Sequence, residues 1–284
     1  MHALYGKLLH ACEVAKHGRA YLTSLESMLR TCGTQPLLPH RPSKGINEDL
    51  DWWSNLLQNG RASRPIYPPT PYHNPQAYSD ASSSIGIGIV IGERWRAWRL
   101  IPGWETQNGQ RDIGWAESIG FELLVRTLAT LPTLGSLLTV YGDNTGVVEG
   151  WWKGRSRNRE VNTVFRRIHE FIGHVPRRFA IHTTYVASEQ NPADGPSRGI
   201  YPPSELLLPP IDIPPAIRNF IIDATLPPTA TELQLLHNGR YPPPAAKVIN
   251  RAILRQEGIE RAQTFREKEE LFLLNAAVHD GAEQ

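Results

Sequence analysis

The run "YSDASSSIGIGIVIGERW", residues 78–95, gives the clearest indication of secondary structure in the sequence. From residue 85 to 91, isoleucine occupies every second position, a period that predicts a β-strand. Glycines fill two of the gaps, and such a thin face lets a helix or a neighbouring backbone approach closely. One acid, Asp80, stands just before this strand. Alone, it would be interpreted as a turn-forming residue.

On both sides of this run, the composition of the chain changes at proline-rich stretches, which favour neither helix nor strand. We expect four segments with different organisation. They are a helical segment at 1–63, a proline-rich linker at 64–75, an α/β domain at 76–199, and a proline-rich linker with a C-terminal helix at 200–284.

Inside the central segment, a strand pattern gives way to a helical one and then alternates with it. This order predicts a mixed sheet covered by helices, in the α/β or α+β class. We expect strands at 76–81, 85–91, 94–101, 137–141 and 178–187, and helices at 113–131, 145–152 and 158–174.

Composition limits the class of protein. The chain has 284 residues and a formal charge of +2, which suits one main core with appendages. Cys12 and Cys32 form neither a disulfide framework nor a metal-binding spacing. With no charged-then-apolar leader and no apolar run of about 20 residues, we expect an intracellular protein, in cytoplasm or nucleus.

Positive charge is concentrated in one part of the chain. Residues 151–178 hold eight Lys or Arg against two acids. Such an excess fits a polyanionic partner, and it fits a solvated helix face equally well. The patch therefore only supports other indications.

Four acids fall at the ends of expected elements: Asp80, Glu117, Asp143 and Asp194. Glu117 is the most informative, because it lies within the apolar stripe of its expected helix. Glu122, about 140° away around that helix, serves as the comparison for an ordinary solvated glutamate.

The other two acids have ordinary explanations. Asp143 ends a strand and could be the N-cap of the next helix, and Asp194 could be a turn or cap residue. Together, however, the four acids could meet at one sheet edge, where unpaired carboxylates require a cation. Oxygen ligands without nearby Cys or His pairs indicate Mg²⁺ or Mn²⁺.

Four motifs resemble, in order, those of the ribonuclease H domain of reverse-transcribing elements. They are "SDASSSIGIGIV", "IGWAESIG", "VYGDNTGVV" and "ASEQNPADGPSR". Upstream, "LYGKLLHACEVAKHGRAYLTSLESML" and "DLDWWSNLL" are similar to the stretch that joins polymerase and ribonuclease H in DIRS-like or gypsy-type retrotransposons. The polymerase palm with its paired aspartates is absent from this sequence.

The resemblance implies a ribonuclease H-like, five-stranded mixed sheet flanked by helices. It also implies cleavage of the RNA strand of an RNA–DNA hybrid with two metal ions about 4 Å apart. By position, Asp80 would bridge both ions, Glu117 and Asp143 would complete one site, and Asp194 the other. His174 and His182 do not match the family's histidine, and we interpret them as core or surface residues.

Substrate contacts are expected at the basic loop and beside two of the acids. Phosphates should meet Lys153, Arg155, Arg157 and Arg159, and Ser82 and Asn144 are candidates for hybrid or 2′-hydroxyl contacts. Two alternatives remain open: a decayed or domesticated nucleic-acid-binding module, and an integrase-like or exonuclease domain of the same superfold. Oligomeric state is not predicted.

Overall fold

The computed structural model describes residues 1–34, 39–59, 70–106, 109–131, 137–176 and 179–238. The chain divides into two compact units, Met1–Pro227 and Pro228–Gln284. Within the second unit, the described element is helix α8 (Ala230–Asn238). The rest of this subsection concerns the first unit.

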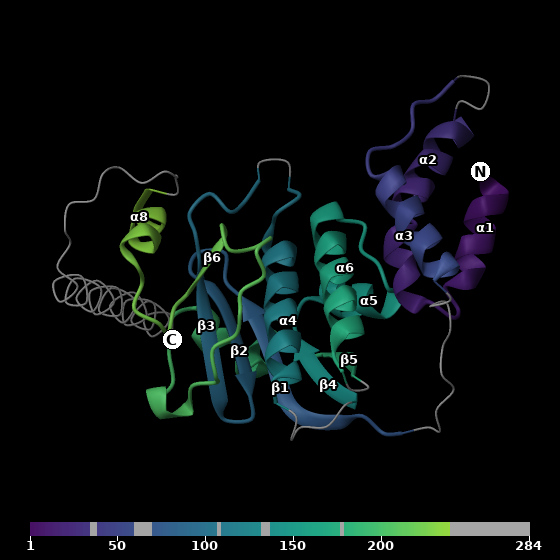
Figure 1. The fold of residues 1–284 in the computed structure, drawn as a ribbon. Coiled ribbons are helices and arrows are strands. Elements are labelled where there is room, and N and C mark those ends of the chain that lie inside the picture. The colour runs from purple at the N-terminus through teal and green to yellow at the C-terminus, as the bar shows by residue number, and fades with distance from the viewer. Residues whose placement is uncertain (35–38, 60–69, 107–108, 132–136, 177–178, 239–284) are drawn as a thin grey trace, which may run out of the picture. The chain divides into compact units, whose positions relative to one another are not determined.

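A six-stranded mixed sheet forms the centre of the first unit, in the order β5-β4-β1-β2-β3-β6 (Figure 1). Its three consecutive strands β1, β2 and β3 pair antiparallel, β6 pairs antiparallel with β3, and β4 and β5 run parallel to β1. The strands are β1 (His73–Ala81), β2 (Gly86–Ile91), β3 (Arg94–Leu100), β4 (Leu137–Gly142), β5 (Ala180–Tyr185) and β6 (Ile221–Asp223). The predicted mixed α/β class is confirmed.

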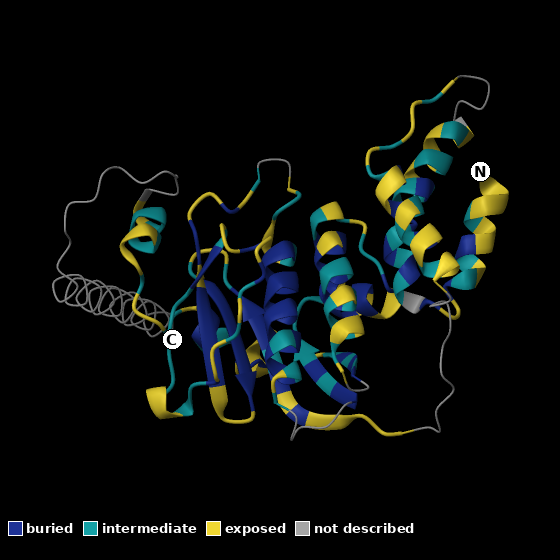
Figure 2. Cartoon of the chain, viewed as in Figure 1, coloured by how far each residue is buried: buried dark blue, intermediate teal, exposed yellow. Residues whose placement is uncertain are grey.

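The main core lies between one face of this sheet and two long helices, α4 (Ile113–Ala129) and α6 (Arg159–His174). Ile87 and Ile89 of β2 point into it, as the period of two predicts. Figure 2 shows that β2, β3 and α4 are almost wholly buried. Helix α4 is enclosed on several sides, so its buried residues include the polar Glu117, Ser118 and Glu122 as well as its apolar side chains.

The opposite face carries a smaller apolar cluster. Val90 and Ala97 pack there with Ala193, which directly precedes the short helix α7 (Asp194–Ser197). Tyr201 stacks on Trp95, with ring centroids 5.1 Å apart. Helices α4 and α6 therefore cover one face, and α7 with the following segment contacts the other.

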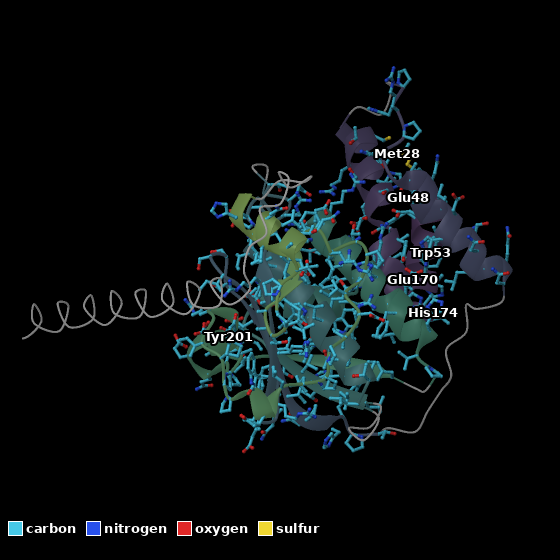
Figure 3. All side chains as sticks on the ribbon, turned by 60° about the vertical axis from the view of Figure 1, so that its left-hand side comes forward. Met28, Glu48, Trp53, Glu170, His174 and Tyr201 are labelled. Atoms are coloured by element: carbon cyan, nitrogen blue, oxygen red, sulfur yellow. The ribbon has the colours of Figure 1, made fainter. Side chains whose placement is uncertain are left out.

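Three helices and a 3₁₀ turn precede the sheet and share a core around Trp53, which Figure 3 labels among them. Their contact with α6 is polar: Arg166 pairs with the buried Asp49 at 2.6 Å and also donates to the carbonyl of Ala20. These elements are α1 (His2–Ala11), η1 (Lys16–Tyr21), α2 (Thr23–Thr34) and α3 (Ile46–Gln58).

Helix caps explain where the central helices begin. The Asp112 carboxylate accepts from the backbone N–H of Trp115 at 3.0 Å, and the Asn158 side chain accepts from the first turn of α6. Short helix α5 (Thr145–Lys153) begins after Asn144, whose side chain accepts from Val147. The N-cap of α5 is thus Asn144, and the interpretation of Asp143 as that cap is wrong.

Two features were not predicted. Strand β1 begins at His73, earlier than expected, and passes through a register irregularity after His73; Gln76 in this stretch has φ 54°. The second feature is β6, which forms within the expected proline-rich linker and extends the sheet from five strands to six. Residues 64–69 of the first linker lie outside the described residues, as does the stretch 245–277, where we expect the C-terminal helix of the last segment.

Among the helices that the structure describes, none has the length and apolarity needed to cross a membrane. Cys12 is buried, Cys32 is half-buried, and both are free thiols.

Candidate metal centre

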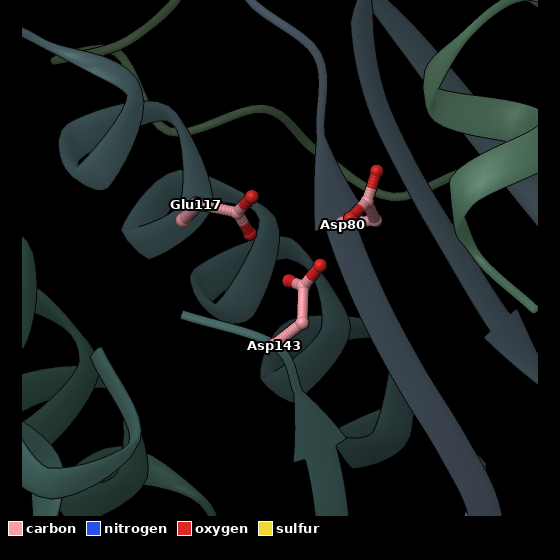
Figure 4. A group of neighbouring side chains, drawn as sticks. All are labelled: Asp80, Glu117 and Asp143. Atoms are coloured by element: carbon pink, nitrogen blue, oxygen red, sulfur yellow. The ribbon is translucent and has the colours of Figure 1, made fainter. Parts of the chain in front are cut away.

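Three of the four predicted acids meet at one edge of the sheet. Asp80, Glu117 and Asp143 each present a carboxylate oxygen, and these oxygens lie within 4.8 Å of one another (Figure 4). Asp80 stands near the end of β1, Asp143 directly follows β4, and Glu117 points toward both from α4. Because β1 and β4 are parallel neighbours, their carboxyl ends deliver both aspartates to the same place.

Close packing of α4 on the sheet brings Glu117 into this group. Gly120, one turn along the helix, faces β1 and β2, and a Cβ there would lie 3.1 Å from Cγ2 of Ile87. The backbone N–H of Ala81 donates to Oε1 of Glu117 at 3.1 Å, which fixes the glutamate beside Asp80. The stripe that singled out Glu117 therefore reflects a true inward orientation.

Burial of the Asp80 and Glu117 carboxylates disfavours their charged forms. Burial and the nearby charges of Asp143 and Asp194 together raise the pKa of Asp80 from 3.8 to about 6, although a hydrogen bond from Ser197 opposes the rise. Burial likewise raises the pKa of Glu117 well above its ordinary value, with Asp80 and Asp143 adding to the effect. A cation among the three acids would reverse this cost.

Asp143 supplies a direct sign that the group suits a metal ion. Its Oδ2 accepts from the Ser188 hydroxyl at 2.5 Å. Its Oδ1 is buried and has no hydrogen-bond partner among the described residues. Buried polar atoms are almost always satisfied, so an unpartnered oxygen on one of three converging carboxylates fits a Mg²⁺ or Mn²⁺ ligand.

Asp80 has two partners that sequence reasoning missed. The Ser197 hydroxyl donates to its Oδ2, and the Asn191 side-chain amide lies 3.4 Å from its Oδ1 and donates to the Ser79 carbonyl at 3.0 Å. Both residues belong to the motif that was selected for Asp194. Nothing in the spacing of that motif shows which of its members face inward.

Asp194 does not join the three acids. It begins α7, keeps a partly exposed side chain and forms an ion pair with Arg198 at 2.7 Å. Its charge still raises the pKa of Asp80. Its role as a ligand of a second ion remains a prediction.

The predicted substrate contacts differ in their surroundings. Lys153 is exposed and pairs with Glu149 at 2.5 Å, whereas Arg155 pairs with Glu26 of α2. Arg157 and Arg159 are exposed at the start of α6. Contacts of these four residues with nucleic acid remain predictions.

The two candidates beside the acids are similarly placed at the surface. Ser82 is half-buried and shares a 3.1 Å hydrogen bond with Ser84, and half-buried Asn144 caps α5. Trp151 is buried while its neighbour Trp152 is 62% exposed, with its indole N–H donating to the Thr183 carbonyl at 2.9 Å.

Glu122 corrects one expectation. The sequence predicts that Glu122 is an ordinary solvated glutamate, but its side chain is fully buried. Arg126 of the same helix and Arg167 of α6 pair with its two oxygens, at 2.9 and 2.5 Å. Two arginines therefore compensate its buried charge, in a network that joins α4 to α6.

Comparisons with known proteins give little beyond this geometry. No protein-family model and no curated protein matches the chain. One solved structure with some likeness is ribonuclease H1 from the halophilic archaeon Halobacterium salinarum NRC-1, at 17% sequence identity and a TM-score of 0.33. The match covers 46% of this chain and 97% of that one. With both measures low, the arrangement of the acids has to carry any functional conclusion.

Proposed function

We propose that the chain is a metal-dependent nuclease that cleaves the RNA strand of RNA–DNA hybrids. The observation that carries this proposal is the convergence of Asp80, Glu117 and Asp143, with one buried Asp143 oxygen lacking a partner among the described residues. The four ordered motifs that resemble ribonuclease H domains supply the substrate class.

The three acids would hold Mg²⁺ or Mn²⁺, and Asp194 is the proposed contributor to a second ion. When bound, a pair of such ions supplies an activated water and stabilises the leaving oxygen, which gives 3′-hydroxyl and 5′-phosphate ends. The protein's own part is orientation. The Ala81 N–H fixes Glu117, the Ser188 hydroxyl fixes one oxygen of Asp143, and burial keeps the Asp80 and Glu117 carboxylates out of bulk water.

Substrate binding is proposed for the surface around these acids. Arg157 and Arg159 have exposed side chains suited to phosphate contact, and Lys153 could exchange its exposed partner Glu149 for a phosphate. Ser82 lies two positions after Asp80, Asn144 directly follows Asp143, and both are proposed to contact the 2′-hydroxyl. This mode of binding requires no base-specific contacts.

We also propose a retroelement origin, of DIRS-like or gypsy-type. It is supported by the resemblance of the N-terminal stretches to the region between polymerase and ribonuclease H. The second candidate function is a nucleic-acid-binding module that no longer cleaves. The observation that favours it is Asp194, which pairs with Arg198 and lies outside the acid group.

Labelled substrates separate these functions. The wild-type protein should cut the RNA strand of a hybrid at internal positions in Mg²⁺, and leave duplex RNA and duplex DNA intact. Asp80→Asn should abolish cleavage while hybrid binding persists. Salt-sensitive binding without cleavage would favour the binding module, and preference for DNA ends would indicate another nuclease.

A further inference from the structure

We propose that Ser197 and Asn191 are positioning residues that set the orientation of the Asp80 carboxylate for a divalent cation. The inference rests on the metal site of the proposed function and concerns how that site is built. It assigns to the segment containing α7 a role that does not depend on whether Asp194 is itself a ligand.

The contacts come from one short segment and reach both oxygens of Asp80. Ser197 is fully buried, and its hydroxyl donates to Oδ2. Asn191 is 4% exposed, and its amide nitrogen faces Oδ1 at 3.4 Å while it donates to the Ser79 carbonyl at 3.0 Å. Both oxygens of the Asp80 carboxylate are therefore contacted by donors from this one segment.

The two donors are themselves held rigidly. The Asn191 side-chain oxygen accepts from the N–H of Ala193 at 3.2 Å, which fixes its amide group toward Asp80. The backbone carbonyl of the fully buried Ala193 accepts a hydrogen bond from the N–H of Ser197 at 3.0 Å. Gly88 in β2 leaves the space into which this backbone fits, since a Cβ there would lie 2.6 Å from the Ser197 nitrogen.

The acceptors around the Ser197 hydroxyl direct its proton. The Ser197 hydroxyl has one proton and two acceptors in reach, Asp80 and the Asp194 carbonyl at 2.8 Å. A charged carboxylate is the stronger acceptor, so the proton is directed to Asp80.

A buried serine near a helix can also stabilise the fold without affecting a metal site. Ser118 is a matched control for this alternative. Ser118 in α4 is fully buried, follows Glu117 directly and donates to the Trp115 carbonyl at 2.6 Å. It resembles Ser197 in burial and lies next to one of the acids in sequence, but its hydroxyl donates to a backbone carbonyl and not to a carboxylate.

The test measures binding of Mn²⁺ alone, from the spin-resonance signal of the free ion, for the full chain and its variants. Ser197→Ala should weaken Mn²⁺ binding about tenfold or more, as loss of groups that orient metal ligands does. Ser197→Cys, similar in size but a weak donor, should shift binding in the same direction if the alanine variant fails to fold. Ser197→Thr keeps the hydroxyl and should bind Mn²⁺ with an affinity nearer that of the wild type. Ser118→Ala should bind Mn²⁺ as tightly as the wild type does.

The outcomes separate this inference from the proposed function. Selective weakening at Ser197 supports it whether or not hybrids are cut. Unchanged Mn²⁺ binding in Ser197→Ala and Ser197→Cys, or equal weakening in Ser118→Ala, overturns it and leaves the nuclease proposal standing. A wild-type protein that binds no Mn²⁺ overturns both, while Mn²⁺ binding without hybrid cleavage overturns only the nuclease.

Discussion

Gly88 lies directly opposite Asp80 in the antiparallel pairing of β1 with β2. A Cβ at Gly88 would fall 2.6 Å from the Ser197 nitrogen and 2.7 Å from the Ala193 carbonyl oxygen, both of them backbone atoms. Backbone cannot move aside as a flexible side chain can. The absence of a side chain at Gly88 therefore lets the segment 191–197 reach Asp80.

Gly88→Ala should push that segment away and loosen the hold on Asp80. We expect a loss of about 1–3 kcal/mol in the free energy of unfolding, typical of overpacking, together with weaker Mn²⁺ binding. Urea unfolding and metal titration measure the two effects. Gly173→Ala is the control, because Gly173 lies in α6 with nothing within 4 Å of an added Cβ, and there alanine should stabilise the helix. Equal stability of Gly88→Ala and wild type would contradict the close packing.

Without metal, stability should fall as pH rises from about 4 to 6. The pKa of Asp80 is raised from 3.8 to about 6, so in this window the folded state binds more protons than the unfolded state. Protonation of Asp80 stabilises the folded state fully below pH 3.8, its pKa in the unfolded chain. This stabilisation, roughly 2–3 kcal/mol, is lost as the pH rises through the folded-state pKa of about 6. The raised pKa of Glu117 acts in the same direction and extends the loss upward.

Unfolding in EDTA across this pH range measures the effect, and added Mg²⁺ should reduce the loss at neutral pH. Asp80→Asn should flatten the slope and raise the midpoint of thermal unfolding near neutral pH, at the cost of function. Asp51→Asn, an exposed acid of α3, should leave the slope as it is. Stability that rises with pH through the window would show that these carboxylates are not buried against one another.

The segment 200–223 should be part of the folded domain. Arg96 is 2% exposed and pairs with Asp223 at 2.6 Å while donating to the Leu208 carbonyl at 2.6 Å. Arg96→Met should cost about 3–5 kcal/mol in urea unfolding, because it leaves Asp223 without its charge partner. Arg99→Met, at an exposed position of the same strand, should cost little.

A second variant tests the pairing itself. Removing both partners, in Arg96→Met with Asp223→Leu, should recover much of the lost stability, since no unpaired charge then remains. If the double variant is as unstable as Arg96→Met alone, the ion pair is not what ties this segment to the sheet.

Local periodicity predicted the sheet, the long helices and the inward orientation of Glu117, because each depends on the pattern within one element. Asp80 and Asp143 were selected by their places at the ends of expected strands and by the four ordered motifs. It did not predict β6, whose three residues follow a proline-rich stretch. Asp223 of β6 pairs with Arg96 of β3, which is 127 positions away in the sequence. Glu122 was misjudged for a similar reason: its partner Arg167 is 45 positions away. Ser197 was missed because a serine acquires a role only when the fold brings a carboxylate to it.

Glu117, with Asp80 and Asp143, is proposed to hold a divalent cation for the cleavage of hybrids. The most direct test is the single-turnover rate at which wild type and Glu117→Gln cut the RNA strand of an RNA–DNA hybrid, in Mg²⁺ and in EDTA. We predict cleavage by the wild type in Mg²⁺ alone, and a fall to background in Glu117→Gln with hybrid binding retained. Equal rates in the two proteins, or wild-type cleavage that persists in EDTA, would contradict the claim.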